Sequence, residues 1–243
     1  LARSSYRAET PVETESCCVH ARCKWVRIYT CNPLVFLVQT LCLHDHIDKE
    51  GGVFRHRITF GGHTKAVSRA VYGGKTGLVY SCSRDTTIRQ WDRSDASALR
   101  VFDGHELACT CLALSEDERT LCSGSRDASV RTWDVQTGSC TATAKVPRNL
   151  VTCLKFLSAA GGGDGNGGAR SDSTCSSSVV VQGGEDLRVR VWDLRGAGLR
   201  EALVIGGYTF FPLCVDVSEG RKEVLTSCKG FDGEGCETKA RMR

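Results

Sequence analysis

Short apolar runs, each bounded by Gly, Ser or Asp, follow one another along the middle of the chain. The first four are AVSRAVY, LVYSCS, TIRQW and ALRVF, and the next four are CTCLAL, TLCSGS, SVRTW and CTATAKV. Turn-forming residues separate them, such as Gly73-Gly74 in the first set and Ser115-Glu116-Asp117 in the second. Runs of this length and spacing predict units of four short antiparallel strands, which is the architecture of a propeller blade.

A sequence repeat organises residues 53–195. Three tryptophans are each followed by aspartate, and the segments around them align as SCSRDTTIRQWD, SGSRDASVRTWD and QGGEDLRVRVWD. Trp91 and Trp133 are 42 residues apart, which fits a propeller repeat of about 40–45 residues. Trp192 follows only after 59 residues. The Gly/Ser-rich stretch 159–178 accounts for the excess, because its composition is typical of a flexible loop.

A set of four polar and aromatic residues recurs at the same spacing in the first two units: His63, Ser81, Asp85 and Trp91, then His105, Ser123, Asp127 and Trp133. One interpretation is the Ser/His/Asp triad of a hydrolase. The other is a structural hydrogen-bonded chain, in which Asp fixes the His tautomer and Ser links the imidazole to the indole N–H. Because an enzyme needs one triad and no G-x-S-x-G motif is present, the sequence favours the structural interpretation and predicts no catalytic residue.

The third unit keeps only Asp186 and Trp192 of this set. Pro147 and Gln182 occupy the His and Ser positions. We therefore expect this unit to depend more on packing than on a polar network.

These residues resemble the tetrad of WD-repeat proteins over about residues 53–240. The resemblance implies an all-β fold, an incomplete WD-repeat β-propeller with three recognisable blades and a partial fourth. It leaves residues 1–52 unassigned, with disorder as one interpretation, and gives a partial propeller over 53–243. The chain begins at Leu1 and stops soon after the Gly-rich segment 230–237, so we expect a fragment. The family further implies a non-catalytic scaffold for protein partners. A narrower resemblance, carried by GSRDASVRTWDVQTG, EDLRVRVWDLRG and the segment 230–237, implies cilium-related assembly or trafficking as its setting.

Composition narrows the functional classes. A hydrophobic content of 41% and a charged content of 25% are typical of a globular protein, and the net charge of +4 is too small and diffuse to indicate nucleic acid. The longest apolar stretch, residues 34–43, is too short for a helix that crosses a membrane. Fifteen cysteines, several within the predicted strands, indicate reduced thiols in the cytosol. We expect no cofactor, no small-molecule substrate and no membrane insertion.

One cysteine-rich cluster near the N-terminus invites a metal interpretation. It consists of Cys17, Cys18, His20, Cys23 and Cys31. A zinc site needs a second ligand pair at a suitable distance, and the spacing does not supply one. An unstructured segment is the favoured interpretation, and we predict no metal site.

Three arginines are candidates for partner binding. Arg84 and Arg126 precede the Asp of the first two repeats, at a position that in WD-repeat proteins faces docking partners, and guanidinium groups match carboxylates. Arg195 completes a WDxR motif over residues 192–195, which is found in substrate receptors of cullin-4 ubiquitin ligases. That receptor role is the alternative function. For each arginine, a solvated surface charge is the alternative interpretation.

Overall fold

The computed structural model describes residues 26–30, 41–46, 54–146, 150–157, 178–196, 198–218, 223–229 and 235–241. Within these ranges the regular elements are all strands. In chain order they are β1 (Val26–Thr30), β2 (Leu41–His46), β3 (Phe54–Phe60), β4 (Val67–Tyr72), β5 (Val79–Ser83), β6 (Ile88–Trp91), β7 (Ala98–Phe102), β8 (Cys109–Leu114), β9 (Thr120–Ser125), β10 (Ser129–Asp134), β11 (Cys140–Lys145), β12 (Val151–Leu157), β13 (Val179–Gly184), β14 (Arg188–Gly196), β15 (Gly198–Ile205), β16 (Pro212–Ser218), β17 (Glu223–Lys229) and β18 (Gly235–Arg241).

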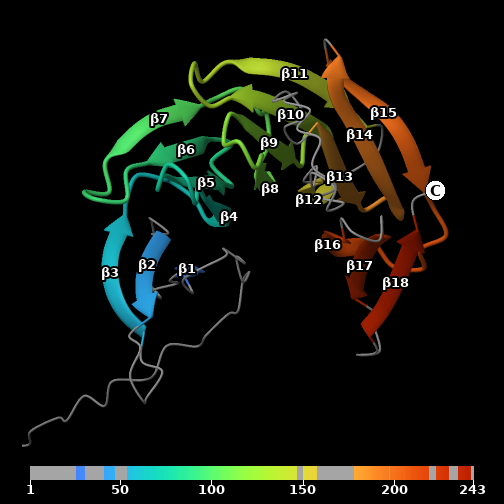
Figure 1. Ribbon diagram of the computed structural model, residues 1–243, viewed down its shortest axis with the longest axis horizontal. Coiled ribbons are helices and arrows are strands. Elements are labelled where there is room, and N and C mark those ends of the chain that lie inside the picture. Colours follow the sequence, from blue (N-terminus) through green and yellow to red (C-terminus); the bar gives the residue numbers. More distant parts are fainter. Residues whose placement is uncertain are drawn as a thin grey trace, which may run out of the picture.

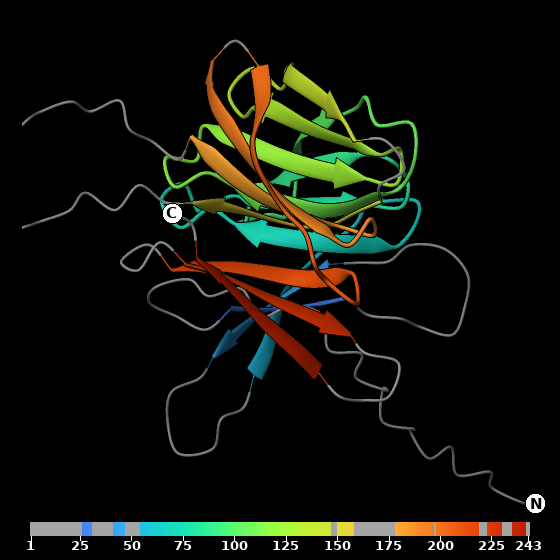
Figure 2. The ribbon, with the colours of Figure 1, turned by 90° about the vertical axis from the view of Figure 1, so that its right-hand side faces the viewer.

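The strands form separate antiparallel sheets that follow one another around an open arc (Figure 1). Three sheets have four strands in chain order, β4–β7, β8–β11 and β12–β15, and two have three strands, β1–β3 and β16–β18. The first strand of each four-stranded sheet lies nearest the centre of the arc and the fourth lies on its outer side. Figure 2 shows β16–β18 side by side, in front of β1–β3. This arrangement confirms the predicted all-β, incomplete propeller.

The two three-stranded sheets lie where the sequence pattern is weakest. β1 and β2 belong to the segment 1–52 that the pattern leaves unassigned, and they pair with each other and with β3. They carry no Trp-Asp or Ser-Arg-Asp signature, so the repeat search does not find them. β18 pairs with β17 although it also lacks a Trp-Asp pair. Residues 1–25 and 158–177, the latter covering most of the predicted loop, lie outside the described residues.

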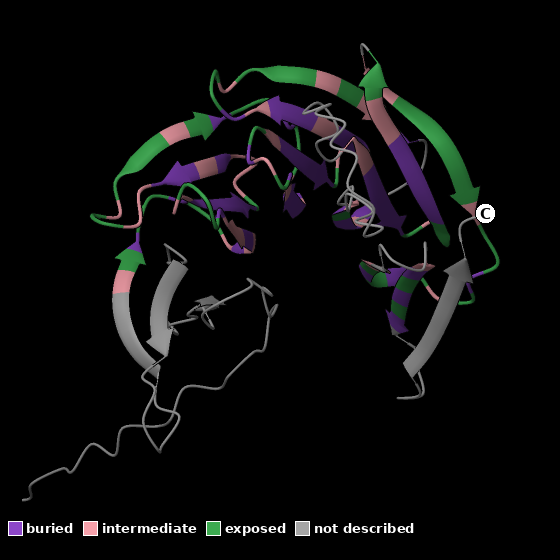
Figure 3. Cartoon of the chain, viewed as in Figure 1, coloured by how far each residue is buried: buried purple, intermediate pink, exposed green. Residues whose placement is uncertain are grey.

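The hydrophobic core lies between neighbouring sheets. Side chains from one face of a sheet, such as Tyr80, Ile88 and Phe102, pack against Leu121 and Trp133 of the next sheet. The same arrangement recurs between β8–β11 and β12–β15, and between β12–β15 and β16–β18. Burial is concentrated on the inner and middle strands, whereas β7, β11 and β15 are largely exposed (Figure 3). Each sheet is therefore stabilised mainly by its neighbours, as in other repeat architectures.

Hydrogen bonds also cross between the sheets. The Thr110 hydroxyl on β8 donates to the carbonyl of Val151 on β12, and the Thr152 hydroxyl makes the equivalent bond to Pro212 on β16. Glu118, in the turn between β8 and β9, places its buried carboxylate against the turn between β4 and β5. The carboxylate accepts bonds from the backbone N–H groups of Lys75 and Thr76, at 2.6 and 2.9 Å. These bonds fix how one sheet sits against the next, because each partner comes from a different repeat.

In the second and third repeats, the close approach of the sheets requires glycine at one position of the second strand, where the first repeat has Cys82. At Gly124 on β9, an added Cβ would overlap the side chain of Val151 and lie 2.6 Å from Cys111 Sγ. At Gly183, the equivalent residue of β13, a Cβ would lie 2.5 Å from Cys153 Sγ. A glycine at this position lets the thiol of the first strand lie directly over the backbone of the second.

Gly124→Ala is expected to destabilise the fold by about 1–3 kcal/mol, because the added methyl group overpacks the boundary between two sheets. The measurement is chemical denaturation monitored by tryptophan fluorescence. Gly74→Ala is the matched control, since nothing lies within 4 Å of a Cβ there, and it should leave stability nearly unchanged. Equal stabilities of the two variants would contradict the proposed packing.

Candidate functional site

The four recurring residues of the first repeat form one continuous hydrogen-bonded chain. Trp91 Nε1 lies 2.8 Å from Ser81 Oγ, which lies 2.8 Å from His63 Nε2. His63 Nδ1 in turn lies 2.8 Å from Asp85 Oδ2. The strands supply Ser81 and Trp91, whereas His63 and Asp85 come from the loops that precede β4 and β6. We call this set a polar tetrad.

The chemistry of the two ends and a neutral His63, whose pKa is lowered by burial, fix the direction of every bond in the tetrad. An indole N–H can only donate, and an ionised carboxylate can only accept. Ser81 therefore accepts from Trp91 and donates to His63 Nε2, and His63 carries its proton on Nδ1, which donates to Asp85. Every polar atom along this buried chain finds a partner, which is the condition for burying it without a large cost.

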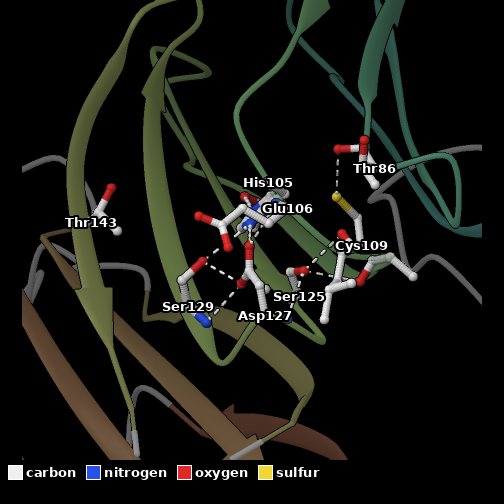
Figure 4. A network of polar contacts seen from close by, with 12 residues as sticks. Thr86, His105, Glu106, Cys109, Ser125, Asp127, Ser129 and Thr143 are labelled. Carbon is white, nitrogen blue, oxygen red and sulfur yellow. Dashed lines mark hydrogen bonds and ion pairs between the residues drawn. The ribbon is translucent and has the colours of Figure 1, made fainter.

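The second repeat reproduces the tetrad. His105 Nε2 lies 2.8 Å from Ser123 Oγ and His105 Nδ1 lies 2.9 Å from Asp127 Oδ2, while Trp133 Nε1 donates to Ser123 over 2.8 Å. Figure 4 shows His105, Asp127 and Ser129 pointing toward one another. Ser129 donates its hydroxyl and its backbone N–H to the same oxygen of Asp127.

The third repeat has a polar network with different members. Gln182 replaces serine, and its side-chain oxygen accepts from Trp192 Nε1 over 2.8 Å. Asp186 is paired with Arg190, at 2.5 Å, and the same guanidinium contacts Glu201 at 3.1 Å. Pro147, which occupies the histidine position in the sequence, lies outside the described residues. The third repeat thus retains a polar network as well as its packing, because a longer amide and an arginine take the polar contacts.

A fourth polar pair, Tyr208 and Thr226, was not predicted from the sequence. Tyr208 and Thr226 are both buried, and the Thr226 hydroxyl donates to the Tyr208 hydroxyl over 3.4 Å. They are 18 residues apart, as are His63 and Ser81, and Tyr208 also follows a glycine. That shared spacing is the signal that locates the pair. Tyrosine and threonine replace the histidine and serine, so a search for those two residue types passes over it.

Electrostatics keep the tetrads neutral at the histidine and ionised at the aspartate. Burial lowers the pKa of His63 and His105, and this effect outweighs the neighbouring carboxylates that raise it. Burial raises the pKa of Asp85, but hydrogen bonds from Thr87 and Thr64 outweigh that and lower it to about 2. Asp127 is held at a pKa of about 2 in the same way, chiefly by Ser129 and His105.

The tetrads are poorly suited to hydrolysis. Ser81 and Ser123 are completely buried, so their hydroxyl groups cannot reach a substrate. Each hydroxyl oxygen also accepts a hydrogen bond from an indole N–H, and a lone pair engaged in this bond is not available to attack a substrate. The arrangement instead links strands and loops within one sheet, which is a structural role.

The loops at the tetrad end of the sheets make up what we call the loop face: hairpins 83–87, 125–129 and 184–187 with connecting segments 61–66, 103–108 and 206–211. The hairpins contact the connecting segments through backbone bonds, from Arg84 N to the Ala66 carbonyl and from Arg126 N to the Ala108 carbonyl. Arg84 and Arg126 are both exposed, and the equivalent residue of the third repeat is the exposed Glu185. The structure therefore places both candidate arginines on one face.

Large apolar side chains are also exposed on the loop face. Leu107 is 53% exposed, Leu187 is 38% exposed and Phe211 is 36% exposed. Leu187, like Thr86 and Ala128 at the same hairpin position, has a positive φ, so the three hairpins share one turn conformation. The loop face thus combines apolar and charged groups, a composition found at protein interfaces.

Comparison with known protein families identifies the repeat. The model of the WD domain, G-beta repeat family matches residues 54–92 and 96–134. These two stretches are WD40 repeats. Each match begins at or just before the outer strand of one sheet and ends with the Trp-Asp pair of the next, so each WD40 repeat spans two neighbouring sheets.

Several curated proteins resemble part of the chain. Pre-mRNA-processing factor 19 of Bos taurus is 32% identical over 139 residues, which is 56% of this chain and 24% of the relative. Eukaryotic translation initiation factor 3 subunit I of Drosophila mojavensis is 29% identical over 92 residues, covering 38% and 29% of the two chains. Protein Notchless of Drosophila melanogaster is 41% identical over 56 residues, covering 23% and 11%. The chain therefore spans less than a third of the length of these relatives.

Arg195, the third candidate arginine, lies apart from the WD40 loop face at the end of β14. Its guanidinium binds the carboxylate of Asp193 through Nε and Nη2, at 2.8–3.1 Å, and its side chain is 72% exposed. This ion pair lowers the pKa of Asp193 to about 2. The structure thus separates Arg195 from Arg84 and Arg126.

Two other expectations concern metals and membranes. Cys17, Cys18, His20, Cys23 and Cys31 lie outside the described residues. Within the part that the structure describes, no three His, Cys, Asp or Glu residues are grouped so as to hold a metal ion. No helix in that same part is long and apolar enough to cross a membrane.

The neutral histidines of the WD40 tetrads predict a loss of stability in mild acid. Because their folded-state pKa is lowered, the unfolded chain takes up protons more readily once the pH falls below the ordinary histidine value of about 6.5. Stability should therefore decline as pH falls from about 7 to 5, and decline further below the ordinary Asp value as Asp85 and Asp127 become protonated. The measurement is urea denaturation at a series of pH values.

The double variant His63→Gln with His105→Gln is the control for this pH dependence. It should be less stable at pH 7 but show a flatter profile between about pH 7 and 5, because it lacks the two groups that titrate there. A wild-type profile that is already flat in this range would be evidence against the assignment.

Proposed function

We propose that this chain is a non-catalytic scaffold that binds protein partners on the WD40 loop face. The observation that carries the proposal is the exposure of Leu107, Leu187 and Phe211 on the same set of loops that exposes Arg84 and Arg126. Exposed large apolar groups among charged ones are characteristic of interaction surfaces.

The tetrads support this role through rigidity. Asp85 and Asp127 each accept bonds from the backbone of two different loops, from Thr64 and Thr87 in the first repeat and from Glu106 and Ser129 in the second. The loops are thereby pre-ordered, which reduces the entropy lost when a partner binds. The serine, histidine and aspartate that the hydrolase interpretation would need are already bonded to one another and to the tryptophan within each tetrad.

The cellular setting is proposed on resemblance. The segments GSRDASVRTWDVQTG and EDLRVRVWDLRG resemble WD repeat-containing protein 31, and we propose a cytoplasmic role in assembly or trafficking at cilia on that basis. The names of the curated relatives indicate pre-mRNA processing and translation initiation for those proteins. In each setting, a role for this chain would rest on binding through the loop face.

Leu107→Glu with Leu187→Glu should abolish the enrichment of partner proteins when the tagged chain is recovered from cells and compared quantitatively with wild type. Charges at the centre of an apolar contact are expected to lower binding at least about tenfold. The matched control is Leu99→Glu with Val101→Glu on the exposed outer strand β7, which should keep the partners. If the loop-face variant keeps its partners while both proteins remain folded, the scaffold proposal fails at this face.

A second candidate function is that of a substrate receptor for a cullin-4 ubiquitin ligase. The observation that favours it is the 72% exposure of Arg195, which leaves the WDxR guanidinium accessible to an adaptor despite its ion pair with Asp193. Arg195→Ala should then reduce recovery of the purified adaptor at least about tenfold, with Arg200→Ala on β15 as the control. Recovery that is unaffected by Arg195→Ala would remove this candidate.

A further inference from the structure

Five basic side chains lie at the loop ends of the first two WD40 repeats. Arg84 and Arg89 come from the first repeat and Arg126 and Arg131 from the second, five residues apart in each. Lys65 adds an exposed charge beside Arg84, since the Lys65 carbonyl accepts a bond from Ser83. We call these five residues the basic cluster.

The hairpins that carry Arg84 and Arg126 flank the same connecting segment. The thiol of Cys109 donates to the carbonyl of Thr86, which attaches the first hairpin to the start of β8 (Figure 4). The backbone N–H of Arg126 donates to Ala108, the preceding residue. The two exposed arginines therefore stand on either side of residues 107–109.

Arg89 and Arg131 lie next to the tetrads of their own repeats. The guanidinium of Arg89 lies 5.9 Å from the ring centre of Trp91, and Arg89 and Arg131 reach past Gly62 and Gly104, where a Cβ would lie 2.9 Å from Nη1. The Nε of each is buried without a hydrogen-bond partner, and among the described residues neither makes an ion pair with a carboxylate. Two cationic groups are thus held in place without a direct ion pair.

In the third repeat, the arginine that corresponds to Arg89 and Arg131 is paired with carboxylates. Glu185 stands where Arg84 and Arg126 stand, and Arg190, at the position of Arg89 and Arg131, is paired with Asp186 and Glu201. The tetrad carboxylates of the first two repeats are instead satisfied by histidine, hydroxyl and backbone donors. At this position, within the described part of the chain, the arginines without a direct ion pair are therefore those of the first two repeats, although each of these repeats also carries an ionised tetrad carboxylate, Asp85 or Asp127.

Two exposed carboxylates, Asp103 and Glu106, lie in the connecting segment of the second repeat. The corresponding residues of the first repeat are Gly61 and Thr64. Positive charge is therefore concentrated around Lys65 and Arg84, and it is reduced near Arg126. An anionic partner would be attracted to the first repeat and repelled locally by Glu106.

We propose that the basic cluster binds an acidic segment of a partner protein, with carboxylates of that segment on Arg84 and Arg126 and the exposed Leu107 contacting an adjacent apolar residue. This rests on the proposed scaffold function and names the chemistry of its partner. Guanidinium groups bind carboxylates through paired hydrogen bonds, and charge complementarity favours an acidic chain over a neutral one. The small net charge of the chain disfavours nucleic acid as the partner.

The test is fluorescence anisotropy of the full chain with a labelled peptide of six glutamates followed by leucine, at low ionic strength. Arg84→Glu with Arg126→Glu should weaken binding at least about tenfold, and Glu106→Gln should strengthen it about twofold or more. Arg119→Glu with Arg200→Glu changes the net charge equally at exposed positions elsewhere and should leave affinity within about twofold. If the charge-reversed variant does not fold, Arg84→Gln with Arg126→Gln replaces it, and its affinity for the peptide should likewise be lower than that of the wild type.

Equal losses in the loop-face and control double variants would overturn the proposal, because they would show an effect of net charge alone. Tighter binding of a labelled thymidine oligonucleotide than of the peptide would also overturn it, in favour of a nucleic-acid partner. If the acidic peptide fails to bind while Leu107→Glu with Leu187→Glu still removes cellular partners, the scaffold function stands and only the acidic partner is rejected.

Discussion

A buried tryptophan must find an acceptor for its indole N–H, and each four-stranded sheet is arranged around that requirement. Trp91, Trp133 and Trp192 each donate over 2.8 Å to a residue on the neighbouring strand. Where that acceptor is serine, a histidine and an aspartate continue the chain of bonds to the loops. Where it is glutamine, an arginine serves the aspartate instead. The requirement is therefore constant, whereas the residues that meet it vary.

In this arrangement the interior of the sheets provides stability, and the loop ends carry the side chains that vary between repeats. The polar networks hold the loops from below, and the apolar surfaces between sheets supply most of the stability. The side chains at the hairpin tips, such as those of Arg84, Arg126 and Glu185, belong neither to the polar networks nor to the apolar surfaces, although their backbone N–H groups help to hold the loops. They can differ between repeats without disturbing the fold, so this is where one repeat can acquire a binding character that the next lacks.

The sequence predicts the parts of the structure that repeat. The spacing of Trp91 and Trp133 locates the sheets, and the recurrence of histidine, serine and aspartate locates residues that the structure brings together. The buried Tyr208–Thr226 pair is missed because different residue types occupy the same places. The contact of Glu118 with Thr76 is also beyond sequence reasoning, because it depends on how two sheets sit against each other rather than on any local pattern.

The Glu118 contact also bears on how the molecule opens. Its carboxylate is bound by three donors of the turn between β4 and β5, the two backbone N–H groups of Lys75 and Thr76 and the Thr76 hydroxyl. That turn cannot fluctuate freely, since moving it exposes a buried carboxylate that belongs to another sheet. The sheets β4–β7 and β8–β11 should therefore exchange their slowest amide hydrogens together, as one cooperative unit, rather than as two independent blades.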